Sequence, residues 1–190
     1  MQKRLAIVLL LVLASACKSP DQKLVSALEV GADVDQVKKA LAAGASPNVV
    51  MPDSKVPALC FSIDKEPRHA DVTLALLDAG ANPNAICNPP TGTTVLQKAA
   101  GDGEVVVVRA LLEKGADKDA ADLSGARPLY LAACAGHADA VGVLKDAGAS
   151  QAGPPPMDAV ACAQFKIKSG PVANRGDFEK VLTVLGASSR

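Results

Sequence analysis

Residues 94–117 read TVLQKAAGDGEVVVVRALLEKGAD, and residues 127–149 read RPLYLAACAGHADAVGVLKDAGA. Both stretches start with a short Ala-rich segment, pass through a glycine, continue with an apolar segment and close on a Gly-Ala pair. Apolar residues at helical spacing bounded by glycines are typical of short amphipathic helices. The two stretches therefore predict the same unit written twice, namely two helices joined by a tight turn.

The closing Gly-Ala pair recurs along the whole chain. Gly44, Gly80, Gly115, Gly148 and Gly186 each end an apolar segment, at spacings of 36, 35, 33 and 38 residues. Two helices and a loop repeated at this period are typical of a solenoid. The second helix of each unit is expected within 37–42, 72–78, 105–113, 140–146 and 178–185, and the units within about 21–46, 47–82, 83–117, 118–150 and 151–188.

The quoted residues resemble ankyrin repeats. The resemblance is most specific over 94–117 and 127–149, includes the unit that starts at Pro57 and closes at Asn82 with about two extra residues near Pro67, and covers nearly all of residues 21–188. It implies an all-α fold, an ankyrin-repeat solenoid of about five helix-turn-helix repeats with short hairpin loops. The corresponding domain would span 23–188.

Individual residues of the repeat have recognisable physical tasks. A proline at the start of a first helix, as at Pro57 and Pro128, occupies a position where its missing N–H costs nothing. Gly115 and Gly148 stand just past a helix end, where a left-handed residue satisfies the last carbonyl groups. The apolar stripe of the second helices is expected from Val106, Leu111, Leu112, Val141 and Leu144.

Several positions depart from the ankyrin pattern. The histidine that ties adjacent loops in that family is replaced by Cys60, Gln97, Tyr130 and Asp158, so the loops are expected to be held less regularly. The first unit lacks the usual Thr-Pro start, and the last has an insertion at 164–174 and a second helix about two residues short. Atypical end units are what a stack needs to close its core, so both are interpreted as caps.

The N-terminus has the layout of a secretory leader. Lys3 and Arg4 precede nine apolar residues, Leu5 to Leu13, and small residues follow. A membrane-spanning helix needs about 20 apolar residues, roughly twice this run. Residues 1–16 are therefore expected to be a signal peptide; the alternative is a buried N-terminal helix.

The leader ends in Leu13-Ala14-Ser15-Ala16-Cys17, which resembles the bacterial lipobox. The resemblance implies that Cys17 is acylated and becomes the mature N-terminus, with 17–22 as a lipidated start and short tether. The alternative is an ordinary leader cut near Ala16. Lys18 rather than Asp after the cysteine favours the outer membrane, so the predicted location is the periplasm.

Charge and composition exclude one class of partner. The 190 residues include 20 basic and 20 acidic side chains, and removal of the leader lowers the balance to about −2. Nucleic-acid binding needs a clustered basic face, so no nucleic-acid partner is expected. Aromatic residues make up only 2% of the chain, so its core must consist of Ala, Val and Leu.

Four cysteines follow Cys17. Cys60 begins a first helix and Cys87 lies in the following loop; in an ankyrin stack these places face each other, so a Cys60–Cys87 disulfide is expected. Cys134 and Cys162 were assigned matching places in adjacent units, about 10 Å apart and beyond bridging distance, so this pair is the less favoured disulfide. The alternative for every cysteine is a buried thiol that fills a small hole.

Chemistry beyond binding finds little support in the sequence. His69 and His137 are interpreted as helix caps, and the paired carboxylates at Asp33 and Asp35 as solvated caps. No Cys/His cluster, phosphate loop or nucleophile elbow occurs in the sequence, so no enzyme activity, metal or cofactor is expected.

The residues that the repeat pattern does not need are the candidate protein-binding residues. They lie in the loops and on the exposed side of the first helices, which together form the curved face of a solenoid. Val49, Val50 and Met51 would form an exposed apolar trio. The full set is Val49, Val50, Met51, Asp53, Phe61, Ile86, Asn88, Pro90, Lys98, Asp122, Leu123, Tyr130 and Leu131.

Three functions remain open from the sequence. The favoured one is a monomeric, periplasm-facing lipoprotein that binds a protein partner of the cell envelope, as an inhibitor or immunity-type partner of an envelope-acting enzyme or toxin. The second is a structural scaffold of an envelope assembly or of the stress-response machinery, without enzyme inhibition. The third is an enzyme.

Overall fold

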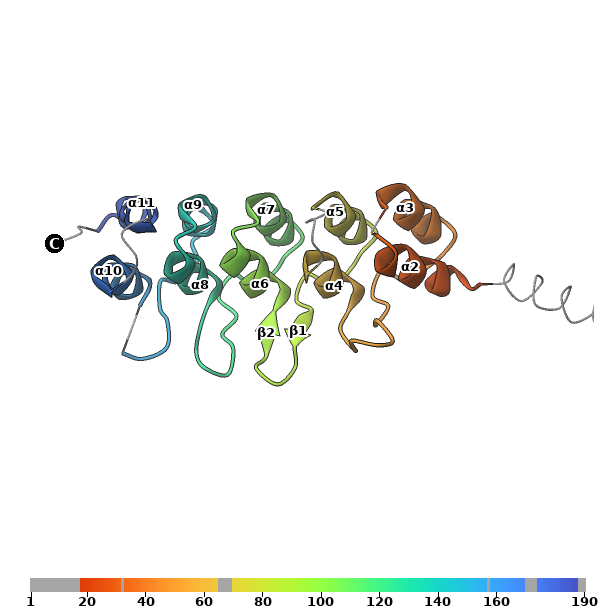
Figure 1. The fold of residues 1–190 in the computed structure, drawn as a ribbon, viewed down its shortest axis with the longest axis horizontal. Helices are drawn as coiled ribbons and strands as arrows, with labels where there is room; N and C mark the ends of the chain where they lie inside the picture. Colours follow the sequence, from red (N-terminus) through yellow and green to blue (C-terminus); the bar gives the residue numbers. More distant parts are fainter. Residues whose placement is uncertain (1–17, 32, 65–69, 157, 170–173, 188–190) are drawn as a thin grey trace, which may run out of the picture.

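The described residues of the computed structural model, 18–31, 33–64, 70–156, 158–169 and 174–187, fold into ten helices that pack as five successive pairs. Figure 1 shows two parallel rows, with the even-numbered helices in one row, the odd-numbered helices in the other, and the long loops projecting from the even-numbered side. The helices are α2 (Pro20–Glu29), α3 (Val34–Ala42), α4 (Ala58–Asp64), α5 (Ala70–Asp78), α6 (Val95–Asp102), α7 (Val105–Glu113), α8 (Pro128–Ala135), α9 (Ala138–Asp146), α10 (Ala159–Ser169) and α11 (Arg175–Leu185).

The loop between α5 and α6 adds a small β-hairpin to this helical stack. Its strands β1 (Ile86–Asn88) and β2 (Thr93–Thr94) pair antiparallel, with Ile86 opposite Thr94. The predicted all-α repeat fold is confirmed, and this loop adds two short strands to it. Short two-stranded hairpins have little stability of their own, so this hairpin depends on the helices behind it.

The predicted helix ends are confirmed at the Gly-Ala pairs. The odd-numbered helices end one or two residues before Gly44, Gly80, Gly115, Gly148 and Gly186, all of which have positive φ. After the α7 end, the Gly115 N–H donates to the Leu112 carbonyl and the Ala116 N–H to the Leu111 carbonyl. This Schellman arrangement needs a left-handed residue, which glycine adopts without steric cost.

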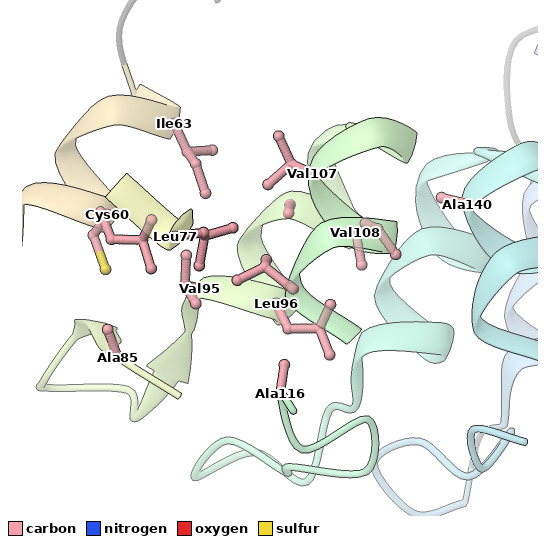
Figure 2. Packing of buried hydrophobic residues seen from close by; sticks show 14 of the residues in the cluster. Cys60, Ile63, Leu77, Ala85, Val95, Leu96, Val107, Val108, Ala116 and Ala140 are labelled. Carbon is pink, nitrogen blue, oxygen red and sulfur yellow. The ribbon is translucent and has the colours of Figure 1, made fainter. Parts of the chain in front are cut away.

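A continuous core of small aliphatic side chains runs between the two rows. Leu76, Leu96, Leu111 and Leu129 are fully buried and are separated by alanines and valines. Figure 2 shows how Leu77, Val95, Leu96, Val107 and Val108 meet between adjacent helices. Within the described residues, Phe178 is the one aromatic side chain in this core. The expectation of an Ala, Val and Leu core is thus confirmed.

The predicted stripe of α7 was wrong at one position. Val106 is 58% exposed, whereas Val107, Val108 and Leu111 are buried. The four consecutive valines, 105–108, offer no periodicity from which to choose the inward face.

The last helical pair differs from the predicted one. Much of the expected insertion at 164–174 continues α10, which extends to Ser169. The second helix, α11, spans 11 residues and is longer than its counterparts rather than shorter. Its Arg175 starts the helix before the Gly176-Asp177 dipeptide, so neither residue marks the helix boundary.

The N-terminal tether is shorter than predicted. Ser19 caps α2, its hydroxyl accepts from the Gln22 N–H, and the Gln22 side chain accepts from the Ser19 N–H. This capping box holds the first turn of the helix. Pro20, Asp21 and Gln22 therefore belong to the first helix. The expected signal peptide, Cys17 and His69 lie outside the described residues.

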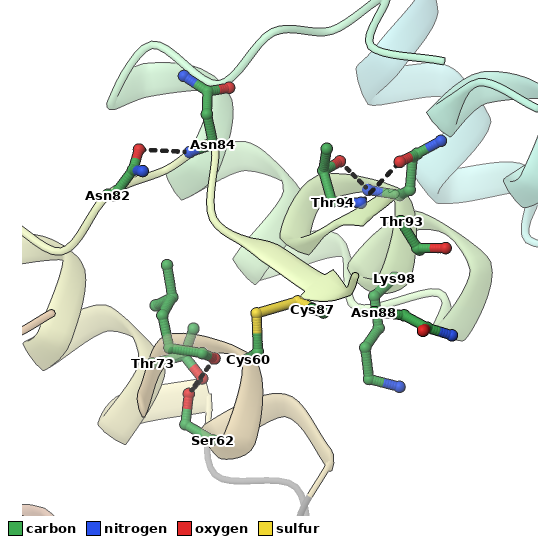
Figure 3. The surroundings of a disulfide bond; sticks show 12 residues. Cys60, Ser62, Thr73, Asn82, Asn84, Cys87, Asn88, Thr93, Thr94 and Lys98 are labelled. Carbon is green, nitrogen blue, oxygen red and sulfur yellow. Dashed lines mark hydrogen bonds between the residues drawn. A yellow bond between two sulfur atoms is a disulfide. The ribbon is translucent and has the colours of Figure 1, made fainter. Parts of the chain in front are cut away.

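The position that carries histidine in ankyrin repeats holds the next loop by a different device in each pair. Cys60 of α4 forms a disulfide with Cys87 of β1, with a Cα–Cα distance of 5.2 Å (Figure 3). The Nε2 of Gln97 donates to the Ala126 carbonyl oxygen at 2.6 Å. The Tyr130 ring covers Gly153, where an added Cβ would lie 2.6 Å from Cε2 of the ring. These three positions thus hold the next loop by a disulfide, a hydrogen bond and ring packing, in agreement with the less regular arrangement expected, whereas the Asp158 carboxylate accepts from the Ala161 N–H of its own helix.

A ladder of polar side chains also joins successive loops at the ends of the second helices. The Asn48 Oδ1 accepts from the Asn82 N–H at 2.7 Å, and the Asn84 Oδ1 accepts from the Asp117 N–H at 2.8 Å. Asp119 continues the ladder, because its Oδ1 accepts from the Ser150 N–H at 2.6 Å. These bonds satisfy backbone N–H groups in the loops that follow the second helices.

Asp119 is the rung with perturbed electrostatics. The hydrogen bond from the Lys118 ammonium is the largest effect that holds the pKa of the Asp119 carboxyl below its usual 3.8. The Ser150 N–H and the charges of Lys118 and Arg127 act in the same direction, and partial burial opposes them. The folded state therefore favours the ionised carboxylate.

The second disulfide joins the two cysteines that were thought too far apart. Cys134 of α8 and Cys162 of α10 are bonded, with a Cα–Cα distance of 5.4 Å. They do not occupy matching places, because Cys134 lies in the last turn of α8 and Cys162 in the first turn of α10. The assumption of equal register was the source of the error, since the Ala-rich sides of α8 and α10 also pack closely.

Candidate functional site

A shallow groove runs between the β-hairpin and the even-numbered helices. Its volume is about 470 Å³, and we call it the hairpin groove. Asn88 and Thr93 line it from the hairpin, Lys98 and Asp102 from α6, and Leu131 from α8. Three predicted contact residues, Asn88, Lys98 and Leu131, therefore line one recess although they come from three different elements.

The floor of the hairpin groove is fixed by interactions already described. Cys87 and Gln97 both line it, and both are held in place, Cys87 by its disulfide and Gln97 by its bond to Ala126. Gln97 also closes a capping box with Thr94, as Figure 3 shows beside the disulfide. A groove whose floor is preorganised loses little conformational entropy when a partner binds.

The groove carries mixed chemistry rather than a strong charge. Lys98 Nζ lies 3.3 Å from Asp102 Oδ2, one helical turn away on α6. Leu131 supplies an apolar wall, and Gly101 leaves room above the helix. Amide, hydroxyl, paired charge and aliphatic groups at close quarters are typical of a protein-binding surface, which has polar groups around an apolar centre.

Two exposed apolar residues stand at the loops beside the groove. Ile86 is 47% exposed and Leu123 is 81% exposed. The loops that carry them are joined, because the Leu123 N–H donates to the Thr91 carbonyl at 2.9 Å. Pro90 is exposed at the turn of the hairpin between these residues. The two joined loops thus carry exposed apolar side chains.

The first loop does not belong to the hairpin groove. Val50 is 52% exposed and Val49 is half-buried, and both line a separate pocket against α2. Met51 was wrongly predicted to be exposed: only 1% of it is accessible. The Met51 N–H donates to the Val56 carbonyl, so the loop folds back and directs this side chain into the core. Asp53 is exposed at the same loop.

The remaining predicted contact residues have divided roles. Phe61 and Tyr130 are half-buried on α4 and α8, and Tyr130 packs over Gly153. The Asp122 carboxylate accepts from the Ser124 N–H, the Ser124 hydroxyl and the Ala126 N–H. Asp122 therefore stabilises its own turn, an arrangement common for Asp in loops.

Some groove residues were missed by the sequence analysis. Gly101, Asp102 and Thr93 line the groove but were not candidates. Gly101 stands where α8 has Cys134, and this absence of a side chain was the available signal. Phe165, 58% exposed on α10, was also missed; it had been assigned to an insertion.

The part of the chain that the structure describes holds no cluster of metal-ligand side chains. No three His, Cys, Asp or Glu side chains gather there as metal ligands would. His137 is the N-cap residue of α9, as predicted, but its side chain makes no capping hydrogen bond and its ring lies against Gly103. None of the helices in the described part is long and apolar enough to cross a membrane.

Comparison with known families identifies the repeated unit. Residues 59–152 match the family model of ankyrin repeats, in three copies. The central repeats of this chain are ankyrin repeats. The matched range contains α4 to α9 and therefore the whole hairpin groove. Ankyrin repeats are generally non-enzymatic modules that bind other proteins, which agrees with the groove described above.

One characterised protein shares a short stretch of similar sequence with this chain. The chain is similar to the potassium channel AKT3 of Oryza sativa subsp. japonica, with 52% identity over 48 residues. The similarity covers 25% of this chain and only 5% of the length of the channel. It therefore concerns a short segment of both proteins.

Proposed function

We propose that this chain is an exported, lipid-anchored binding module that faces the bacterial periplasm. Its hairpin groove would hold one protein partner of the cell envelope. That partner would be an envelope-acting enzyme or toxin, which the module inhibits. The chain itself would perform no reaction.

The hairpin groove is the observation that supports binding. It lies within the ankyrin repeats and is lined from three elements. Its floor is fixed by a disulfide and by a hydrogen bond from the buried Gln97 side-chain amide. The exposed Leu123 and Ile86 flank it. Apolar side chains at the edge of a preformed recess are what a partner can cover with a gain in free energy.

The N-terminal leader and the cysteines support the proposed location in the periplasm. The leader ends in a lipobox-like Leu13-Ala14-Ser15-Ala16-Cys17, and the four later cysteines form two disulfides. Disulfides persist in oxidising compartments such as the periplasm and are rare in the reducing cytosol. Acylation at Cys17 by two or three chains would anchor the module stably.

Partner capture from the intact envelope tests the proposal. The full chain, with its own leader and a C-terminal tag, is expressed in a bacterium, crosslinked in place and purified with whatever it holds. Leu123→Glu is expected to reduce the yield of one specific partner at least about tenfold, because a charge then faces an apolar contact, a loss of about 1.4 kcal/mol.

A matched control is available on the opposite row of helices. Val106→Glu introduces the same charge at another exposed aliphatic residue, but on α7, away from the hairpin groove. It should leave capture unchanged. Equal loss in both variants, or no captured protein, would reject the groove as the binding site. A captured enzyme whose activity is unaffected would favour the scaffold function instead.

A further inference from the structure

The pocket beside the N-terminus has a different character from the hairpin groove. Its volume is about 500 Å³, and its apolar lining consists of Val25 from α2 with Val49, Val50 and Pro52 from the first loop. Val50 and Pro52 are exposed, while Val25 and Val49 are half-buried. The two walls are held together, because the Asp21 Oδ1 accepts from the Ser46 N–H at 2.7 Å.

This pocket lies next to the N-terminal end of the described chain, close in sequence to Cys17. Lys18 is itself one of the lining residues, and it is bonded directly to Cys17. Consecutive Cα atoms are about 3.8 Å apart, so any group attached to Cys17 starts beside the pocket. The Ser19 capping box begins the helix at once and leaves no linker to separate them.

We propose that the first helical pair docks on the surface of the lipid bilayer, with Val25, Val49, Val50 and Pro52 at the boundary between headgroups and acyl chains. The inference rests on the proposed acylation of Cys17. An acylated Cys17 would hold the pocket against the membrane, within the roughly 5–10 Å over which apolar side chains enter an interface.

The polar groups of the pocket fit such an occupant. The Lys18 ammonium donates to the Ser26 hydroxyl at 2.9 Å and stays exposed at the rim. A lysine at this level places its charge among lipid phosphates while its methylene groups cover apolar surface. The Asp21 carboxylate, which anionic lipids would repel, accepts a backbone hydrogen bond within the protein.

Docking in this way would leave the hairpin groove accessible. Figure 1 shows α2 at one end of the elongated stack and α10 and α11 at the other. With the first pair against the bilayer, the later pairs would extend away from it. The exposed apolar side chains of the first loop would then contact the membrane, and those of Ile86 and Leu123 would contact the protein partner.

Tryptophan fluorescence can test the docking without interference, because the chain contains no tryptophan. Three single variants of the full chain are expressed in a bacterium: Val50→Trp in the pocket, Val30→Trp at the opposite end of α2, and Leu123→Trp in the loop between α7 and α8. Each purified protein is placed in vesicles of phosphatidylethanolamine and phosphatidylglycerol, with and without bromine in the acyl chains. The mass of the N-terminal peptide reports acylation of Cys17.

The expected result is a blue shift of the emission and strong bromine quenching for Val50→Trp alone. Val30 and Leu123 are both more exposed than Val50, so their tryptophans should stay in water. If acylated protein shows no quenching at Val50→Trp, or equal quenching at all three positions, the docking is wrong while the anchor stands. If the peptide carries no acyl group, the anchor and the docking both fail, whereas partner binding through the hairpin groove is unaffected.

Discussion

Two neighbouring repeats hold the loop that follows them with bonds of different kinds. In α4, Cys60 holds the following hairpin through a covalent bond to Cys87. In α6, Gln97 holds the following loop through one hydrogen bond to the Ala126 carbonyl. A disulfide acts mainly by restricting the unfolded chain, whereas a buried hydrogen bond acts by satisfying a polar group in the folded chain. The residue at this position of the repeat can therefore stabilise the fold by acting on either the unfolded or the folded chain.

The largest effect is expected when the covalent tie is removed. Cys60→Ala with Cys87→Ala opens a loop with a sequence separation of 27 residues. The free energy of unfolding, measured with denaturant in the absence of reductant, should fall by about 2–4 kcal/mol. Added reductant should narrow the gap between the parent and the variant, because the parent then loses the same bond. An unchanged stability would mean that the hairpin is held by its packing alone.

A smaller loss is expected when the hydrogen-bonded tie is removed. Gln97→Ala removes one of the two hydrogen bonds that the buried Ala126 carbonyl accepts, the other coming from the Asp122 N–H, and also opens the capping box with Thr94. Denaturant unfolding should show a loss of about 1–3 kcal/mol. Arg109→Ala, an exposed position on α7, should change stability by less than about 0.5 kcal/mol. A Gln97 variant as stable as this control would contradict the proposed tie.

The third device, the Tyr130 ring over Gly153, can be tested by overpacking. Gly153→Ala would place its Cβ 2.8 Å from Cγ of the ring, with an expected loss of about 1–3 kcal/mol. Gly176→Ala is the matched control, since no atom lies within 4 Å of its added Cβ, and a helical alanine should stabilise slightly. Thermal unfolding of both variants should therefore shift in opposite directions. If the Tyr130→Ala background does not reduce the Gly153→Ala loss, the ring is not the obstacle.

The smallest effect is expected at the polar ladder. Asp119→Asn keeps an acceptor for the Ser150 N–H, as Asn48 and Asn84 have at their rungs, but removes the charge that faces Lys118. The loss at neutral pH should be below about 1 kcal/mol, since the pair is partly exposed.

The pH dependence of this loss has a definite sign. The folded state lowers the pKa of Asp119 below 3.8, so its contribution is present above that pH and disappears as the pH falls through the folded-state pKa. Unfolding of parent and variant between neutral and acid pH should thus converge at the acid end. Divergence in acid would show that the charge destabilises the fold.

The sequence predicted best where one residue type has one conformational role. Glycine after an apolar helix marked the second-helix ends, because left-handed backbone at a helix end strongly favours glycine. It predicted poorly where the outcome depended on distant contacts. The burial of Met51 follows from the closure of its loop onto Val56, and nothing in the apolar trio Val49-Val50-Met51 distinguishes its third member.

Several residues of the candidate site could be predicted from the sequence, but which of them lie together in one groove could not. The repeat pattern named Asn88, Lys98 and Leu131 as candidates, and the structure brings them together, with Asn88 exposed and the other two half-buried. It could not separate Val49 and Val50 from them, because that depends on how α2 packs against the first loop. Cys134 and Cys162 show the same difficulty, since their distance depends on a register that only the folded α10 reveals.

The two disulfides divide the stack mechanically. One joins α4 to β1 and the other joins α8 to α10, whereas α6 and α8 adhere only through packing and hydrogen bonds such as that of Gln97. Under tension between the membrane end and a pulled partner, the segments enclosed by the disulfides, with separations of 27 and 28 residues, cannot be drawn out. The chain would therefore lengthen outside these two segments, in the first helical pair and in α6 and α7, while the two crosslinked segments resist extension.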